Sequence, residues 1–288
     1  MNNLKYLIQF LIIVTLLLTF KILGLKLSLT LSSHILKYFG PFFRSNNISN
    51  SNLSRALPDL SEIDKKIILK KMWSNYGKIL AEYLFMKQFR YAKSFSKNII
   101  IENQEELELI KKEGKPVIFI SGHFNNFELM AMHIEKSGID LAAIYRPLNN
   151  IFLNPFMEFL RKKYVCKNQI KKGINGVREA IDFIKNNHSI ALMVDQRVSE
   201  GENVSFFNKP ALTTTLPAQL AIKYNLKIIP VFIKRTSNDK FEIKFDNGID
   251  PKDFKNKQEL TEQLNFVLEK MIIRHPYEWI WTHNRWKQ

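Results

Sequence analysis

Two apolar segments stand at the start of the chain, before any periodic pattern begins. Residues 6–20 carry no charged side chain and lie between Lys5 and Lys21. A helix of this length spans about 22 Å, whereas the hydrocarbon core of a bilayer is about 30 Å thick. The segment reaches across when residues 22–25 are added and Lys21 extends its charged end to the interface. No small-residue cleavage site follows, so we expect an uncleaved membrane-anchoring helix rather than a signal peptide or a buried core helix.

The second apolar segment, 27–43, contains aromatic residues and few cations, and it predicts a helix that lies in the membrane interface. Residues 46–54 are rich in Asn and Ser and predict a polar connector. We therefore expect a membrane anchor in residues 1–45 and a separate domain in residues 46–288. The chain has no acidic residue before Asp59, and more cations follow the first apolar segment than precede it, which predicts that the body of the protein is cytoplasmic.

Helical and strand-like patterns alternate through the rest of the chain. Ser61 is a helix cap, and apolar residues recur at helical intervals from there to Tyr83. Beyond that helix we expect strands at 98–102, 116–121, 141–145, 190–194, 228–233 and 241–245, and helices at 104–113, 127–137, 154–164, 176–186, 213–224 and 257–273. Such alternation predicts an α/β fold, with a mostly parallel mixed sheet flanked by helices on both faces.

The composition adds a charge that needs an explanation. The 288 residues carry 43 Lys and Arg against 27 Asp and Glu, for a net charge of +16, and 45% of them are hydrophobic. Phosphorylated substrates, anionic membranes and nucleic acid would each fit a basic chain. The single cysteine, Cys166, excludes an internal disulfide and fits a reducing compartment. Because it has no strand–turn–helix setting, we interpret it as structural.

The segment from Ser121 to Glu128, Ser-Gly-His-Phe-Asn-Asn-Phe-Glu, joins a predicted strand to a predicted helix. His123 and Glu128 would lie about 140° apart on a continuous helix. With His123 in the turn and Glu128 in the first helical turn, the imidazole can fold over the carboxylate. The carboxylate then fixes the tautomer, and the other ring nitrogen takes a proton from a hydroxyl. The same spacing also suits a histidine near a helix cap. Its position at the carboxyl end of a strand favours the general base, because open α/β sheets bind ligands there.

Two further polar clusters follow predicted strands. Arg146 comes after the strand at 141–145, and Asp195 with Gln196 comes after the strand at 190–194. Taken alone, Arg146 suits a solvated turn and Asp195 suits a cap. Since a parallel sheet brings the carboxyl ends of its strands to one edge, we expect these side chains to meet the His123 turn.

At these residues the chain resembles the late acyltransferases of lipid A biosynthesis, the lauroyl/myristoyl transferase family, whose signature is His-x4-Asp/Glu. The resemblance covers nearly the whole chain and is carried by an ordered series of motifs. The family usually has Gly where this chain has Asn208, and Asn also adopts a left-handed backbone. The matching positions after His123 and Glu128 are Tyr145-Arg146-Pro147, Asn149-Asn150, Arg161, Asp195-Gln196, Phe206-Phe207, Pro210-Ala211, Thr213-Thr214, Arg274-His275-Pro276, Trp279, Trp281, His283, Arg285 and Trp286.

The resemblance implies an acyltransferase that moves a fatty acyl chain from acyl-acyl carrier protein to a hydroxyl of an acylated, phosphorylated glucosamine disaccharide, the lipid A precursor. It implies His123 and Glu128 as catalytic residues and Arg161, Asp195 and Arg146 as substrate-binding residues. It implies no metal or cofactor. The expected location is the bacterial inner membrane, with the catalytic domain on the cytoplasmic side.

Other functions fit parts of the sequence. The charge alone permits a membrane-bound nucleic-acid-binding protein, but no binding module is recognisable, so we expect no nucleic-acid partner. A metal-dependent hydrolase could use His123 and His133, but no spacing resembles a ligand set. Within acyl transfer, the acceptor could be another lipid, of the lysophosphatidate or phosphatidylinositol mannoside type.

Overall fold

A single sheet forms the centre of the protein in the computed structural model, which describes residues 2–43, 46–93 and 97–287. Its seven strands run in the order β1-β9-β8-β2-β5-β3-β4. All neighbours are parallel except β8 and β9. The mostly parallel mixed sheet predicted from the sequence is therefore confirmed. The strands are β1 (Ile99–Glu102), β2 (Ile118–Ser121), β3 (Leu141–Tyr145), β4 (Asn168–Lys171), β5 (Ser189–Met193), β8 (Ile228–Arg235) and β9 (Phe241–Phe245).

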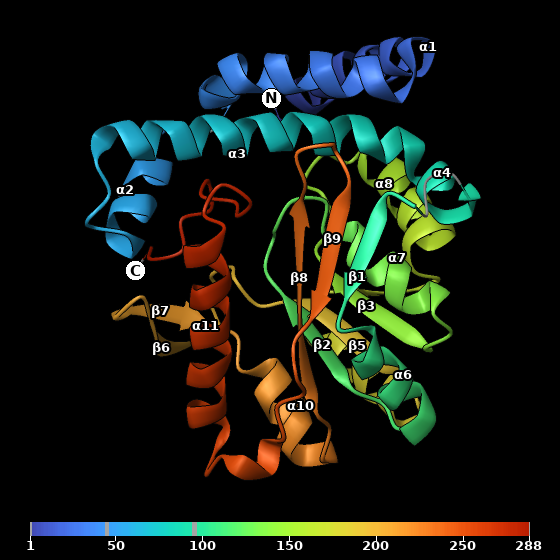
Figure 1. Cartoon of the computed structure of the whole chain (residues 1–288), viewed down its shortest axis with the longest axis vertical. Helices are drawn as coiled ribbons and strands as arrows, with labels where there is room; N and C mark the ends of the chain where they lie inside the picture. The colour runs from blue at the N-terminus through green and yellow to red at the C-terminus, as the bar shows by residue number, and fades with distance from the viewer. Residues whose placement is uncertain (1, 44–45, 94–96, 288) are drawn as a thin grey trace.

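Helices cover both faces of this sheet. The connections from β1 to β2, β2 to β3 and β3 to β4 run in one direction across the sheet, and those from β4 to β5 and β5 to β8 run in the other. Right-handed crossovers therefore place the two sets of helices on opposite faces, as Figure 1 shows for α6 and α7 against α10 and α11. The helices are α6 (Gln104–Glu113), α7 (Glu128–Lys136), α8 (Asn154–Leu160), α9 (Ile174–Lys185), α10 (Leu216–Tyr224) and α11 (Lys257–Arg274), with a 3-10 turn η3 (Pro251–Asp253) before α11.

Several segments differ from the predictions. The sequence gives no sign of β4, because its residues are mostly polar, nor of the separate hairpin of β6 (Glu202–Phe206) and β7 (Lys209–Thr213). The hairpin turns through Phe207 and Asn208, whose φ angles are 52° and 56°. Asn208 thus adopts the left-handed backbone that its position requires. The helix predicted over 154–164 ends at Leu160 and continues as a π-helical turn, η2 (Arg161–Val165).

The connector predicted at residues 46–54 is wrong, because this segment is a helix, α2 (Asn46–Ala56). Its polar residues are held by tertiary contacts that local composition does not reveal. Leu53 is buried, and the side chain of Asn52 donates a hydrogen bond of 2.9 Å to the carbonyl of Trp281. Residues 44–45, at the predicted boundary between anchor and body, lie outside the described residues, and the division there stays a prediction.

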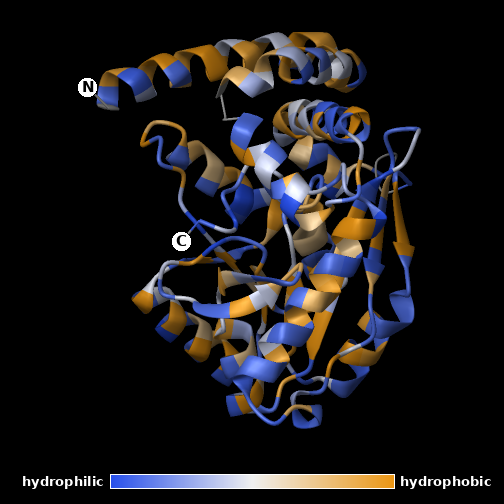
Figure 2. Cartoon of the chain, turned by 90° about the vertical axis from the view of Figure 1, so that its left-hand side faces the viewer, coloured by the Kyte–Doolittle hydropathy of each residue, from blue (hydrophilic) through white to orange (hydrophobic). Residues whose placement is uncertain are grey.

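The N-terminal segment forms the long helix α1 (Asn2–Phe43), which breaks at Gly24, where φ is 71° and ψ is 172°. The break separates two halves at the point where the sequence predicted two apolar helices. Among the described residues, one helix, Asn3–Phe42, is long and apolar enough to cross a membrane, with a mean hydropathy of 2.3 and 11% of its most apolar window buried. In Figure 2 hydrophobic residues make up much of the ribbon of α1.

The second half of α1 packs closely on α3 (Glu62–Glu82), which lies between α1 and the sheet (Figure 1). A side chain at Gly77 of α3 would place its Cβ 2.1 Å from the carbonyl oxygen of Ser32, so only glycine allows this approach. Ser61 caps α3 by accepting a hydrogen bond from the amide of Asp64, as predicted. The chain then passes through η1 (Tyr83–Phe85) and α4 (Met86–Tyr91) to β1.

Candidate active site

The turn between β2 and α7 presents His123 against the end of β5. A side chain at Gly122 would place its Cβ 3.3 Å from Cβ and Cγ of Asp195, so the backbone comes close to that residue. The amide of His123 donates a 2.9 Å hydrogen bond to Oδ2 of Asp195, and His123 Nδ1 lies 2.8 Å from Oδ1. The indole of Trp279 donates to Oδ2 at 2.8 Å. Three groups therefore contact the Asp195 carboxylate, and one of them is the imidazole that the carboxylate orients.

The charge of Asp195 is stable in this position. Burial disfavours the ionised carboxylate, since the residue is 2% exposed. The charge of His123, together with the hydrogen bonds from His123 and Trp279, outweighs burial and lowers the pKa of Asp195 to about 2. An ionised Asp195 accepts the Nδ1–H of His123, which leaves Nε2 of the neutral ring as the proton acceptor.

Glu128, which the sequence analysis expected to orient His123, has other partners, and that expectation is corrected here. Its Oε1 accepts hydrogen bonds from the hydroxyl of Tyr83 at 2.9 Å and from Nε of Arg161 at 2.8 Å, and Arg161 Nη2 lies 2.7 Å away. The reason is spatial. β5 pairs directly with β2, so Asp195 reaches the imidazole from the neighbouring strand, while Glu128 begins α7 and meets η1 and η2.

The Glu128–Arg161 ion pair is nearly buried, with side-chain exposures of 7% and 11%. Burial disfavours the guanidinium, but the charge of Glu128 outweighs it and raises the pKa of Arg161 above its usual range. Burial, followed by the charge of Glu128, likewise raises the pKa of Tyr83 well above its usual range. Arg161 and Tyr83 therefore stay protonated at neutral pH, and no sequence pattern pointed to Tyr83 as part of the site.

A cavity of about 190 Å³ lies beside these residues. His123, Glu128, Arg161 and Arg146 line it, so four of the five predicted site residues share one cavity, and the fifth, Asp195, lies buried behind His123. Much of the rest of its wall is apolar, and most of these apolar residues come from α7, β3, β5 and η2. These residues include Phe127, Ala131, Ala143, Val165, Ala191 and Met193.

The rim of the cavity carries a cation that the sequence analysis did not single out. Lys172 lines the cavity together with Arg146. Burial, and next the charge of Arg146, lower the pKa of Lys172. Lys172 follows β4 directly, as Arg146 follows β3, and because β4 was not recognised from the sequence, its carboxyl end could not be located.

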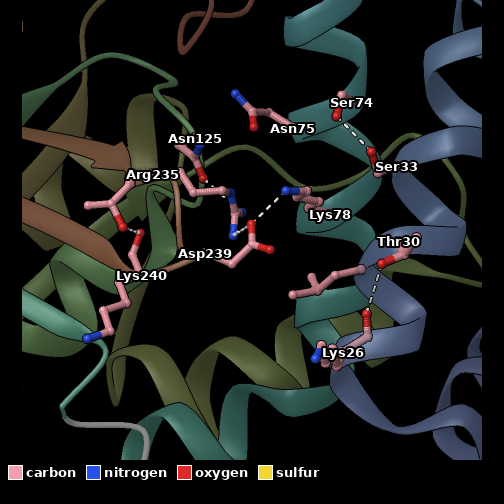
Figure 3. A network of polar contacts seen from close by, with 12 residues as sticks. Lys26, Thr30, Ser33, Ser74, Asn75, Lys78, Asn125, Arg235, Asp239 and Lys240 are labelled. Carbon is pink, nitrogen blue, oxygen red and sulfur yellow. Dashed lines mark hydrogen bonds and ion pairs between the residues drawn. The ribbon is translucent and has the colours of Figure 1, made fainter.

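A buried polar network holds the turn that carries His123. Arg235 of β8 donates two hydrogen bonds to the carboxylate of Glu82, at 2.7 and 3.0 Å, and a third to Oδ1 of Asn125 at 3.0 Å. Asn126 donates to Glu82 at 2.9 Å, and Asn125 donates to Glu278. In Figure 3, Arg235 lies between Asn125 and an ion pair that joins Lys78 of α3 to Asp239 of the loop between β8 and β9. The turn is therefore tied to α3, β8 and the C-terminal segment at once.

We expect the Arg235→Gln substitution to destabilise the protein by about 3–5 kcal/mol, because it leaves the buried carboxylate of Glu82 without its cation. Acyl transfer should fall further than the loss of folded protein explains, since Asn125 loses its anchor as well. Urea unfolding and a turnover assay on the folded fraction measure the two effects. Lys234→Gln is the matched control on the same strand, where Lys234 pairs with Glu242 at a more exposed position. Equal free energies of unfolding for Arg235→Gln and Lys234→Gln would contradict the role of Arg235 in the buried network.

For Glu128→Ala we expect a loss of stability of similar size, because Arg161 remains as an unpaired, nearly buried cation. A double variant, Glu128→Met with Arg161→Met, should recover most of that stability, since two apolar side chains replace the ion pair without leaving a charge. Thermal unfolding of the three proteins checks this. Full stability of Glu128→Ala with lost turnover would instead place Glu128 in the reaction itself.

Two other polar side chains do not fit an active role. Cys166 is buried, and burial first raises the pKa of its thiol to about 12, which agrees with the structural interpretation. His133 is partly buried, and burial lowers its pKa to about 4; its ring lies 6.4 Å from that of Phe245. In the part of the chain that the structure describes, no group of three or more His, Cys, Asp or Glu side chains is placed to hold a metal ion.

An imidazole braced by a buried carboxylate, at the wall of an apolar cavity with cations at its rim, is an arrangement suited to chemistry on a lipid hydroxyl. The sequence model of the bacterial lipid A biosynthesis acyltransferase family matches residues 1–288, and the chain belongs to that family. It is an acyltransferase enzyme, as the sequence predicted.

Individual relatives are distant. The chain is 23% identical to a lipid A biosynthesis acyltransferase of Haemophilus influenzae, over 83% of this chain and 76% of that protein. It is 23% identical to lipid A biosynthesis acyltransferase 2 of Shigella flexneri, over 80% and 74% of the two chains, and 21% identical to a lipid A biosynthesis palmitoleoyltransferase of Escherichia coli, over 86% and 80%. Among solved structures it is similar to the 1-acyl-sn-glycerophosphate acyltransferase PlsC of Thermotoga maritima, with a TM-score of 0.44 and 15% identity over 89% of this chain and all of that one.

Proposed function

We propose that the protein transfers a fatty acyl chain from acyl-acyl carrier protein to a hydroxyl of an acylated, phosphorylated glucosamine disaccharide, a lipid A precursor. The observation that carries the proposal is the His123–Asp195 pair at the wall of a cavity that also contains Arg161 and Arg146. An alcohol is a weak nucleophile at neutral pH, and this pair supplies the base that it needs.

In the proposed reaction, His123 Nε2 takes the hydroxyl proton as the alcohol oxygen attacks the thioester carbonyl. The negative charge of Asp195 stabilises the imidazolium that forms. When the tetrahedral intermediate collapses, the new C–O bond remains, the C–S bond breaks, and the imidazolium returns its proton to the departing thiolate. No covalent acyl-enzyme is required, because the thiolate is a good leaving group.

Arg161 has a different role in this scheme. Its Nε–H donates to Oε1 of Glu128, and its Nη2 lies 2.7 Å from the same oxygen, which holds the guanidinium at the cavity wall. The N–H groups of Arg161 that Glu128 does not engage are donors for the oxygen that becomes negative during attack, or for an anionic group of the substrate. Glu128 is then a positioning residue for Arg161 rather than for the base.

Arg146 and Lys172 are suited to a phosphate of the substrate. β3 lies two strands from β2 and β4 lies three, so at about 4.8 Å per strand the two cations follow strand ends about 10 and 14 Å from the strand end that carries His123. A phosphorylated sugar can reach from this rim to a hydroxyl at the imidazole. Burial and, after it, the charge of Arg146 lower the pKa of Lys172, and a bound phosphate would relieve the repulsion between the two cations.

The apolar α1 and the basic charge support a location at the inner membrane, with the catalytic domain on the cytoplasmic side, where carrier-bound acyl chains and lipid precursors meet.

Purified protein incubated with acyl-acyl carrier protein and a lipid A precursor tests the function by mass spectrometry. We expect one additional acyl chain in ester linkage on the precursor, and at most a trace of that product with His123→Ala over the same time. An unchanged precursor, together with acylation of lysophosphatidate or a phosphatidylinositol mannoside under the same conditions, would transfer the function to that acceptor.

A further inference from the structure

The segment between β3 and β4 exposes large apolar side chains. Ile151 is 55% exposed, Phe159 52%, Leu148 39% and Phe152 37%. We call these four residues the α8 face, because they lie on α8 or on the loop that leads into it. Exposed apolar residues that gather in one segment, rather than singly, mark a contact with a membrane or another molecule.

The α8 face continues into the surface of α1. The ring of Phe152 lies 6.0 Å from that of Phe10, and Asn150 donates a 2.9 Å hydrogen bond to the carbonyl of Tyr6. Phe156 of α8 packs beside the cluster that contains Phe20 of α1. In Figure 1, α1 and α8 lie at the same end of the molecule, and α6 lies at the other. The first half of α1 and the α8 face thus form one apolar surface.

The segment that carries the α8 face is rich in cations. Residues 145–172 contain seven Lys and Arg and one acidic residue, Glu158. Glu158 is itself engaged, since it accepts a 2.8 Å hydrogen bond from Tyr145 and lies 3.1 Å from Nζ of Lys171. The ammonium of Lys163 lies 5.0 Å from the ring centre of Phe159. An apolar centre with a cationic border is complementary to a bilayer that contains anionic phospholipid.

The same segment begins and ends at the cavity. Tyr145 and Arg146 precede the α8 face and line the cavity, and Arg161 and Val165 follow it and line the cavity too. We propose that the α8 face docks on the bilayer beside α1, so that the rim of the cavity meets the lipid headgroups and a lipid acceptor reaches His123 without crossing water. The identity of that acceptor rests on the proposed function, but the docking surface does not.

Continuity with α1 distinguishes this surface from a docking site for an acidic protein. A protein partner would need only the cations, which the chain carries in excess elsewhere, and would leave the exposed aromatic rings next to an apolar helix unexplained. The bilayer accounts for both features with one contact.

Fluorescent labels on single cysteines test the proposal in the full-length protein. Ile151→Cys and Phe159→Cys carry a bimane label, and Leu109→Cys on α6, where Leu109 is 43% exposed, is the matched control. The native Cys166 is buried, and the unsubstituted protein measures its background labelling. Each protein is reconstituted into vesicles of phosphatidylethanolamine and phosphatidylglycerol, with or without brominated acyl chains.

We expect brominated lipid to quench the labels at positions 151 and 159 severalfold more than the label at position 109, and aqueous iodide to do the reverse. Replacing phosphatidylglycerol by phosphatidylcholine should weaken the lipid quenching. Equal quenching at all three positions would overturn the proposal. So would protection from iodide that appears only when acyl carrier protein is added. Because no step of this experiment measures acyl transfer, its outcome is separate from that of the proposed function.

Discussion

In the Asp195→Asn variant we expect kcat for acyl transfer to fall by about 10⁴-fold, the loss seen when the carboxylate behind a catalytic histidine becomes an amide. The amide cannot hold a positive imidazolium, and its NH₂ group can donate to Nδ1, which would leave the proton on Nε2. Nε2 of His123 would then already carry a proton and could not take one from the acceptor hydroxyl.

The shape of the site should survive this change, because Asn and Asp are nearly isosteric and Trp279 can still donate to the side-chain oxygen. The KM for the acceptor is therefore expected to stay within a few-fold of the wild-type value. Steady-state kinetics with both substrates varied separates the two parameters. A variant that loses acceptor binding and keeps kcat would show that Asp195 acts on the substrate rather than on His123.

The second large effect concerns His123 itself. In His123→Ala we expect transfer to fall by about 10²–10⁴-fold, the usual contribution of a positioned general base. Stability should fall by about 1–3 kcal/mol, less than for Arg235→Gln, because the buried Asp195 loses the imidazole but keeps the hydrogen bonds from the backbone amide of residue 123 and from Trp279. Membrane attachment should be unaffected, since α1 is untouched.

Turnover of purified His123→Ala with a radiolabelled acyl donor measures the loss, with thermal unfolding and vesicle flotation as controls. Ala is preferable to a polar residue, whose own side chain could hydrogen-bond the hydroxyl and replace part of the function of the base. Turnover near that of the wild type, in protein with unaltered folding, would remove His123 from the mechanism.

Much of the fold could be predicted because the signal was local. The strands β2, β5 and β8 are short runs of apolar residues, and their burial on both faces is what a parallel sheet produces. The exceptions have a common cause. α2 and β4 are polar segments whose structure depends on distant partners, such as the contact of Asn52 with Trp281, which no local pattern encodes.

The sequence predicts which side chains follow the strand ends that form the site, but not which of these side chains contact one another. A sheet places His123, Arg146 and Asp195 at one edge, and that much follows from the order of the elements. Which carboxylate reaches the imidazole depends on which strand lies next to β2. The spacing of His123 and Glu128 favoured the nearer residue in sequence, whereas the pairing of β2 with β5 brings Asp195 nearer in space.

Glu82 and Arg235 illustrate the same limit. They are separated by 153 residues, yet their ion pair holds the turn between His123 and Glu128. Nothing in either local sequence distinguishes them from charged residues on a solvated surface. Only the packing of α3 across the carboxyl end of β8, which Figure 1 shows, brings them together and buries them.

The central claim is that Asp195 holds the imidazole of His123 so that Nε2 is free to accept a proton. The tautomer of His123 tests it most directly, by long-range ¹H–¹⁵N spectra of protein labelled at histidine, with the signal assigned by its absence in His123→Ala. Above the pH at which the ring becomes neutral, we predict that the proton stays on Nδ1. A neutral ring that carries its proton on Nε2 would contradict the account.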